Sequence, residues 1–224
     1  MTAKPEHREA LAIASQVAAE AAVLLRGAQE DIGEIRNKST HRDWVTQWDT
    51  RAEELILSRL HQLAPGVPVL AEESGQHGSE EASTYWLVDP IDGTVNFAHG
   101  LPLFGICISL EEAGQPVAAA VEAPAMSWTF AASLGGGSTC NGKPMSVSKR
   151  ERLDESILAS GFPYDRATSG HNFPQWEHFQ RKAGACRRFG AASLDLCMVA
   201  KGVLDGYWET RLSPWDLSAG ALMV

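Results

Sequence analysis

Cysteine pairs, basic charge and long apolar runs are all scarce in this sequence. Its 224 residues include four cysteines, and none of them lies in a CxxC pair. Because cytosolic disulfides are rare, we expect buried free thiols and a cytoplasmic protein. Lys and Arg number 19 against 28 Asp and Glu, so the formal net charge is −9. This acidity makes a nucleic-acid ligand unlikely, because a phosphate backbone is bound mainly by basic residues.

The sequence also shows no clear membrane-spanning or secretion signal. No apolar run reaches the roughly 20 residues of a membrane helix without a charged or polar interruption, so no membrane association is expected. The polar start, residues 1–8, leads directly into an amphipathic pattern, so no signal peptide is expected. A chain of this length fits one good-sized domain or two closely packed lobes.

Two long helices are predicted in the first part of the chain. Apolar residues recur at helical spacing over residues 6–29, and this helix should end near Gly27. A polar stretch, residues 35–42, separates it from a second helix over residues 47–63. Pro65-Gly66 should stop that second helix.

Short strands dominate the middle of the chain, and strands alternate with helices after about residue 150. Predicted strands cover residues 67–71, 85–88, 104–110, 117–122, 128–133, 157–160, 186–189 and 203–209, with a hairpin turn at Asn141-Gly142. Later helices are predicted over residues 173–184 and 191–201 and from Trp215 onward. The fold class is therefore α/β, with an α+β first lobe (1–150) holding most metal ligands and an α/β second lobe (151–224). The last helix ends on Leu-Met-Val without a cap, so we expect uncovered apolar surface and a truncated chain.

Acidic residues follow two of the predicted strands. Glu72-Glu73 comes after one strand, and Asp89 and Asp92 come after the next. Ligand sites in α/β structures favour the carboxyl ends of strands, and carboxylates gathered there repel one another unless a cation is present. Magnesium prefers oxygen ligands and fits this need. Any one of these acids alone would more often be a surface turn residue.

The sequence Asp89-Pro90-Ile91-Asp92-Gly93-Thr94 makes a simple turn an unlikely explanation. Pro90 makes the turn rigid, Gly93 permits close approach of a ligand to the backbone, and Thr94 can begin a helix whose free N–H groups face an anion. Carboxylates for metal beside N–H groups for phosphate suit phosphoryl transfer. Haloacid dehalogenase phosphatases are excluded, because their two aspartates are separated by one residue, whereas Pro90 and Ile91 separate Asp89 from Asp92.

With this motif extended to Phe97, the chain resembles the inositol monophosphatase family over nearly its whole length. Four further blocks, in the right order, carry the resemblance: Lys38-Ser39 through Asp49, Ala71-Glu72-Glu73-Ser74 (with Ala where the family has Gly), Gly190 to Cys197 with Leu204 to Glu209, and Trp215-Asp216-Leu-Ser-Ala-Gly. The resemblance implies a layered αβαβα sandwich of the sugar phosphatase type. It also implies a magnesium-dependent phosphoric monoester hydrolase that uses metal-activated water and forms no phosphoenzyme.

The resemblance assigns roles to individual residues. Glu72, Asp89 and the carbonyl of Ile91 should hold one magnesium, and Asp89, Asp92 and Asp216 a second, with a third, weaker ion near Glu72. Asp49 and Thr94 should orient and deprotonate the attacking water, which together with Glu72 gives the catalytic set. Thr46-x-x-Asp49 also fits a capping arrangement at a helix start, and both roles can hold at once.

Substrate contacts are likewise implied by the resemblance. The expected set is Asp92, Gly93, Thr94, Ala192, Glu209 and Asp216. Gly93 and Thr94 should offer backbone N–H groups to phosphate, and Glu209 should contact sugar hydroxyls. The alternative for Glu209 is an exposed acid at a strand end. Lys38 matches a position near the third metal. His99 is more often a loop residue than a ligand.

The resemblance leaves the substrate open. Thr94-Val95-Asn96-Phe97 favours myo-inositol 1-phosphate, while the alternatives on this fold are a 3′(2′),5′-bisphosphate nucleotidase, fructose-1,6-bisphosphatase and histidinol phosphatase. A different class is a non-catalytic regulator that binds RNA or protein. A homodimer and lithium sensitivity are further expectations from the family.

Overall fold

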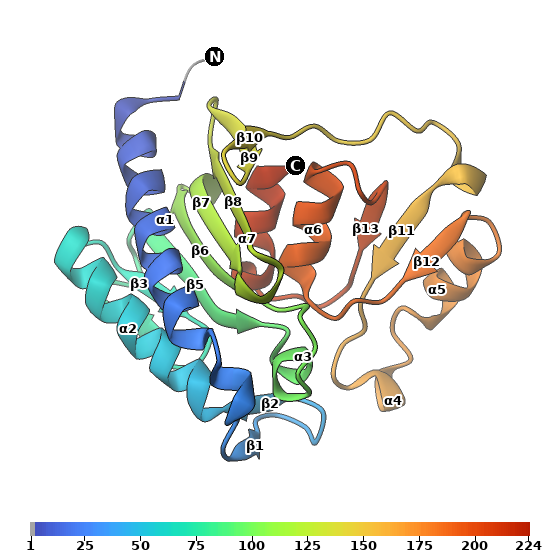
Figure 1. The fold of residues 1–224 in the computed structure, drawn as a ribbon, viewed down its shortest axis with the longest axis horizontal. Helices are drawn as coiled ribbons and strands as arrows, with labels where there is room; N and C mark the ends of the chain where they lie inside the picture. Colours follow the sequence, from blue (N-terminus) through green and yellow to red (C-terminus); the bar gives the residue numbers. More distant parts are fainter. Residues whose placement is uncertain (1–2) are drawn as a thin grey trace.

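The computed structural model describes residues 3–224 as five stacked layers (Figure 1). From one side to the other these are two long helices, a large sheet, a second pair of helices, a small sheet and an outer helix. The α/β class and the αβαβα sandwich predicted from the sequence are confirmed.

The helices lie outside the large sheet, between the two sheets and outside the small sheet. They are α1 (Pro5–Leu25), α2 (Gln47–Leu63), α3 (Thr94–Ala98), α4 (Arg166–Ser169), α5 (Phe173–Gln180), α6 (Ala192–Ala200) and α7 (Pro214–Met223), with short 3-10 helices at Ala28–Glu30, Pro124–Met126 and Leu153–Glu155. The two helices α1 and α2 pack against each other and against one face of the large sheet, whereas α6 and α7 cover its other face.

The large sheet has eight strands in the order β10-β9-β8-β7-β6-β5-β3-β4. These strands are β3 (Val69–Ala71), β4 (Gly75–His77), β5 (Thr84–Asp92), β6 (Gly105–Glu112), β7 (Gln115–Ala123), β8 (Trp128–Ser133), β9 (Gly137–Cys140) and β10 (Lys143–Pro144). All neighbours are antiparallel except β3 and β5, which run parallel. That one parallel pair brings two carboxyl ends to the same edge of the sheet.

The small sheet is parallel, with the order β12-β11-β13. Its strands are β11 (Ile157–Ser160), β12 (Ala185–Arg187) and β13 (Gly206–Trp208), and a separate hairpin pairs β1 (Ile35–Asn37) with β2 (Trp44–Thr46). The two main sheets draw on residues 69–144 and 157–208. The domain division at residue 150 stays a prediction, because α6 and α7 pack on the large sheet as well.

Helix α1 shows why composition alone misjudges this chain. The segment Pro5–Glu30 is long and apolar enough to cross a membrane by length and composition, although Glu20 and other polar residues interrupt it, as expected from the sequence. Its apolarity comes largely from alanine. The small side chains of Ala14, Ala18, Ala21 and Ala22 are fully buried, and α1 contacts β6, β7 and α2. Small residues allow this close packing on the sheet, which is the position of a core helix in a globular protein.

Several predicted boundaries differ from the structure. The predicted polar stretch, residues 35–42, contains β1, while β4 and α4 were not predicted at all. Strand β5 continues to Asp92 because a register shift between Asp89 and Asp92 keeps the Pro90 segment in the sheet. The predicted end of this strand at Val88 is therefore wrong. Both Asp89 and Asp92 belong to the strand and pair with residues of β6.

Helix α7 is better covered than its sequence suggests. Ala219, Gly220 and Met223 are buried against β5, β6, β7 and α6. The expected uncovered apolar surface on this helix is therefore largely wrong, because the sheet supplied by residues far earlier in the chain covers it.

Candidate active site

Parallel pairing of β3 and β5 brings two acidic segments together. Ala71 is paired with Val88, and the Glu72 N–H donates to the Val88 carbonyl at 3.1 Å. Glu72 therefore lies beside Asp89, as the sequence predicted for acids at the carboxyl ends of neighbouring strands. The Asp89 side chain is 1% exposed and accepts a hydrogen bond from the Ile91 N–H at 3.0 Å.

The ionised form of Asp89 is disfavoured by burial and by neighbouring negative charges. Loss of solvent raises its pKa well above the usual range, and the nearby carboxylates of Glu72, Asp92 and Asp216 raise it further. A buried site with several carboxylates favours a proton or a cation over a full set of negative charges.

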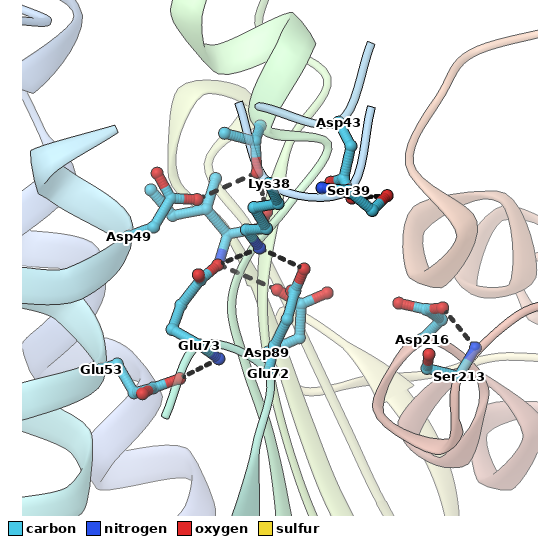
Figure 2. A network of polar contacts seen from close by, with 12 residues as sticks. Lys38, Ser39, Asp43, Asp49, Glu53, Glu72, Glu73, Asp89, Ser213 and Asp216 are labelled. Atoms are coloured by element: carbon cyan, nitrogen blue, oxygen red, sulfur yellow. Dashed lines mark hydrogen bonds and ion pairs between the residues drawn. The ribbon is translucent and has the colours of Figure 1, made fainter. Parts of the chain in front are cut away.

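Lys38 supplies one positive charge to this edge of the sheet. Its ammonium donates to Glu72 Oε1 at 2.8 Å and to Glu73 Oε1, and Figure 2 shows the nitrogen between the two carboxylates. Burial opposes the charge on Lys38, but the two glutamates outweigh this effect and raise its pKa. Burial and Glu72 in turn raise the pKa of Glu73 to about 7, while Lys38 lowers it. The Glu73 N–H donates to Glu53 Oε2 at 2.8 Å, which anchors the segment to α2.

Asp92 is held by the start of α6 rather than by its own strand. Its carboxylate accepts from the N–H groups of Ala192 at 3.2 Å and Ser193 at 2.8 Å, and also from the Ser193 hydroxyl. Burial raises the pKa of Asp92 to about 6, whereas the bonds from Ser193 lower it. The N–H of Ala192, a residue predicted to contact the substrate, is thus directed at Asp92. Sequence reasoning gave Ser193 no role, because its contact with Asp92 joins residues 101 positions apart.

Asp216 faces the same region from α7. In Figure 2 it lies apart from the Lys38 network, across from Glu72 and Asp89. Its carboxylate caps α7 by accepting the Ser213 N–H at 2.7 Å. Burial and then the neighbouring Asp92 raise its pKa to about 8.

The carboxylates form an open arrangement. Among residues 3–224, no three His, Cys, Asp or Glu side chains lie close enough together to hold a metal ion as they stand. Their chemistry nevertheless fits magnesium: all the donors are oxygens, and the pKa values of Asp89, Asp92 and Asp216 are each raised by neighbouring carboxylates, a repulsion that a cation relieves.

Asp49 and Thr94 connect α2 to the motif. Asp49 is fully buried, and its Oδ2 accepts from the N–H and the hydroxyl of Thr46, both at 2.7 Å. Its Oδ1 lies 2.9 Å from the Thr94 hydroxyl, which is also 3.0 Å from the Ile91 carbonyl. The capping arrangement and the contact with Thr94 therefore coexist. Burial raises the pKa of Asp49, which suits a base.

Gly93 and Thr94 form the start of α3. Gly93 has φ 88°, and an added Cβ would lie 3.0 Å from the Leu103 carbonyl, so glycine is required here for both conformation and space. Within residues 3–224 no acceptor is found for the N–H groups of Gly93 and Thr94. His99 stacks on Trp44 with ring centroids 5.2 Å apart, which agrees with a loop residue rather than a ligand.

Glu209 approaches the site from the small sheet. It follows β13, and its Oε2 accepts a hydrogen bond from the Tyr207 hydroxyl. Burial and the Asp92 charge raise its pKa, whereas Tyr207 and Arg188 lower it. The large and small sheets thus contribute acids to one region.

Comparison with known proteins identifies the family. The sequence profile of the inositol monophosphatase family matches residues 6–224. The chain belongs to the inositol monophosphatase family. An inositol-1-monophosphatase of Mesorhizobium japonicum is 38% identical over 204 residues, which cover 89% of this chain and 77% of the relative. The Nus factor SuhB of Pseudomonas aeruginosa is 39% identical over 194 residues, covering 84% of this chain and 71% of the relative.

Solved structures of this family share the fold. The inositol monophosphatase of Anabaena superposes with a TM-score of 0.86 at 35% identity, covering 95% of this chain and 79% of that protein. The resemblance to the family inferred from the sequence blocks is confirmed. Membership in the inositol monophosphatase family implies a phosphatase, and the family is in general magnesium-dependent.

Proposed function

We propose that this protein hydrolyses a small phosphate monoester, myo-inositol 1-phosphate, in a magnesium-dependent reaction. The observation that carries the proposal is the convergence of Glu72, Asp89, Asp92 and Asp216 from different elements beside the Asp49–Thr94 pair. The names of relatives such as the Mesorhizobium japonicum inositol-1-monophosphatase support the substrate.

The metal ligands in this proposal are those predicted from the sequence. Glu72, Asp89 and the Ile91 carbonyl would hold one ion, and Asp89, Asp92 and Asp216 a second, with a third near Glu72. When bound, magnesium would supply positive charge that stabilises the phosphoryl oxygens and makes water a stronger nucleophile.

The chain's own residues orient the water and accept its proton. The Thr94 hydroxyl carries one proton, which it donates to Asp49 Oδ1 at 2.9 Å. Its lone pairs can then accept a hydrogen bond from water. As the water oxygen attacks phosphorus and the bond to the inositol oxygen breaks, the water proton passes through Thr94 to Asp49, whose raised pKa favours its uptake. The departing inositol oxygen takes a proton from solvent water, which completes the alcohol product.

Substrate binding is assigned to both sides of the site. The N–H groups of Gly93 and Thr94 would bind phosphate oxygens. Glu209 would accept hydrogen bonds from hydroxyl groups of the leaving inositol. The Ala192 N–H, which donates to Asp92, would order that carboxylate next to the same group.

Phosphate release from myo-inositol 1-phosphate, with magnesium or with a chelator, tests the proposal. Native protein should release phosphate only with the metal, and Asp92→Asn should lower turnover by at least about a hundredfold. Asp154→Asn, at an exposed acid in the second lobe, is the matched control and should keep native turnover. Faster cleavage of adenosine 3′,5′-bisphosphate, fructose 1,6-bisphosphate or histidinol phosphate would replace the proposed substrate.

A regulatory role is the second candidate, and it is supported by the similarity to the SuhB Nus factor of Pseudomonas aeruginosa. If Asp92→Asn abolished turnover but left a cellular phenotype of the gene's deletion fully complemented, the regulatory function would be favoured. Homodimer formation, lithium inhibition and a cytoplasmic location stay predictions.

A further inference from the structure

The carboxylate of Glu209 occupies space that only a glycine at position 161 leaves open. A Cβ added to Gly161 would lie 2.0 Å from Glu209 Oε2 and 2.2 Å from both Oε1 and Cδ of the same carboxylate. Gly161 is not among the glycines with positive φ, so its backbone conformation suits any residue. Glycine is therefore needed here for the space it leaves to Glu209.

Asn172 fixes the backbone on which this carboxylate rests. The Asn172 side chain is 1% exposed, and its Nδ2 donates to Ser160 Oγ at 2.7 Å and to the Gly161 carbonyl. Its Oδ1 accepts the indole N–H of Trp208 at 2.6 Å. One amide thus joins the end of β11 to the residue that precedes Glu209.

The backbone conformation of Asn172 favours asparagine over most other residues. Its φ is +68°, in the left-handed region that most side chains avoid and asparagine tolerates. Its carbonyl accepts the Trp176 N–H at 2.9 Å, which begins α5. Ser160 Oγ donates to the Trp208 carbonyl at 2.7 Å, so β11 and β13 are also tied directly.

Glu209 itself remains available to a ligand. Tyr207 occupies its Oε2, while Oε1 has no hydrogen-bond partner within residues 3–224. No ion pair of the described residues includes Glu209. A charged oxygen that is fixed in place but unpaired suits recognition of a hydroxyl group.

We propose that Gly161 and Asn172 are positioning residues that set leaving-group specificity by holding the Glu209 carboxylate against Gly161. This inference rests on the proposed function, in which Glu209 binds hydroxyls of the leaving group. Because the overlap at position 161 is with the end of a flexible side chain, Gly161→Ala folds and moves Glu209 instead. The substrate class selected is a phosphate ester of a polyhydroxylated alcohol.

The test compares two substrates that differ in their leaving-group hydroxyls. The specificity constant, kcat/KM, is measured for myo-inositol 1-phosphate and for para-nitrophenyl phosphate, whose leaving group offers no alcohol hydroxyl. Gly161→Ala should lower the ratio of the two constants at least about tenfold, as expected when a hydrogen bond to a charged group is lost. Gly206→Ala adds the same methyl group to β13 of the same sheet, where it meets only Leu158 Cδ2 at 3.1 Å, and should leave the ratio unchanged.

A double-mutant cycle separates positioning from general destabilisation. Glu209→Ala alone should lower the ratio, and Gly161→Ala added to it should lower the ratio no further. Asn172→Asp, which keeps the acceptor for Trp208 but loses the two donors, should shift the ratio in the same direction as Gly161→Ala. Additive losses, or an equal loss on both substrates, would overturn the inference.

Failure of the proposed function would give a different experimental result from failure of this inference. A native protein that cleaves para-nitrophenyl phosphate but not myo-inositol 1-phosphate refutes the proposed substrate. The positioning of Glu209 is then decided by the crystal structure of Gly161→Ala: a displaced carboxylate supports it, and a carboxylate in its native place overturns it.

Discussion

At the scale of single residues, Asp49 combines a structural role with a proposed catalytic one. One carboxylate oxygen accepts two hydrogen bonds from Thr46 at the start of α2, and the other lies 2.9 Å from the Thr94 hydroxyl. A single substitution of Asp49 cannot separate the two roles, because it would lower stability and activity together.

A pair of variants separates the two roles of Asp49. Thr46→Ala removes the side-chain cap and one of the hydrogen bonds to Asp49, but it keeps the Asp49 carboxylate and its contact with Thr94. It should lower the free energy of unfolding by about 1 kcal/mol while leaving turnover within a few-fold of native. Asp49→Asn loses part of the same cap and also the base, so turnover should fall by roughly a hundredfold or more. Chemical denaturation and steady-state phosphate release measure the two quantities. Equal activity of the two variants would show that Asp49 acts only as a cap.

The sequence predicted most residues of the candidate site but not what surrounds them. Asp89, Asp92 and Thr94 belong to one local motif, so their proximity follows from a few bonds of backbone. Ser193 lies 101 positions from the Asp92 that its backbone and hydroxyl groups bind, and Asn172 lies 36 positions from Trp208. Nothing local in the sequence marks either residue, because each acts through a contact that tertiary packing creates.

At the scale of elements, the first turn of α6 controls the charge of Asp92. Burial raises the pKa of this carboxyl, and the N–H groups of Ala192 and Ser193 and the Ser193 hydroxyl lower it, with a net pKa of about 6. The helix therefore keeps Asp92 ionised down to a lower pH than burial alone would allow.

Loss of the Ser193 hydroxyl should make magnesium use more sensitive to acid. In Ser193→Ala the pKa of Asp92 rises, so protons compete better with the cation. The magnesium concentration for half-maximal turnover should increase several-fold at pH 6 relative to native, with a smaller increase at pH 8. Ser218→Ala is the control, since that buried hydroxyl contacts only Ser109 at 2.9 Å and not a site acid. An identical increase at both pH values would contradict this account.

Element boundaries show the same division between local and distant causes. The 47–63 helix was predicted with its observed bounds, because Thr46 and Pro65-Gly66 mark its ends in the sequence. Strand β5 was predicted too short, since its final residues stay in the sheet only through pairing with β6. The hairpin of β1 and β2 was missed because all its residues except Thr46 are exposed or half-buried and carry little apolar alternation.

At the scale of the whole molecule, the packing of the layers removes acids of several elements from solvent: Glu73 after β3, Asp195 in α6 and Asp216 in α7. Burial raises the pKa of Glu73 from 4.5 to about 7, and those of Asp195 and Asp216 from 3.8 to about 8. Each of these groups binds protons more tightly in the folded than in the unfolded state. Their contribution to stability is therefore complete below about pH 4 and is lost as the pH rises through about 8.

Metal-free protein should lose stability across this pH window. With a chelator, the melting temperature should fall between pH 5 and pH 8, by about 2–4 °C for each kcal/mol lost in a chain of this size. Magnesium should reduce this fall, because the cation offsets the carboxylate repulsion. Circular dichroism melts with chelator or magnesium measure both slopes. The same pH slope under both conditions would show that the cation does not bind among these acids.

The sequence alone determined the fold class, the family and the motif residues, because each depends on residue types at short, fixed spacing. Periodicity gives helices and strands, and Asp89 to Thr94 carries its chemistry within six consecutive residues. The tertiary structure alone decided that α1 is a core helix and that α7 is covered by the large sheet. It also decided that Ser193 binds Asp92 and that Glu209 rests on Gly161. These features join residues distant in the chain, whose proximity depends on the packing of whole layers and not on any local pattern.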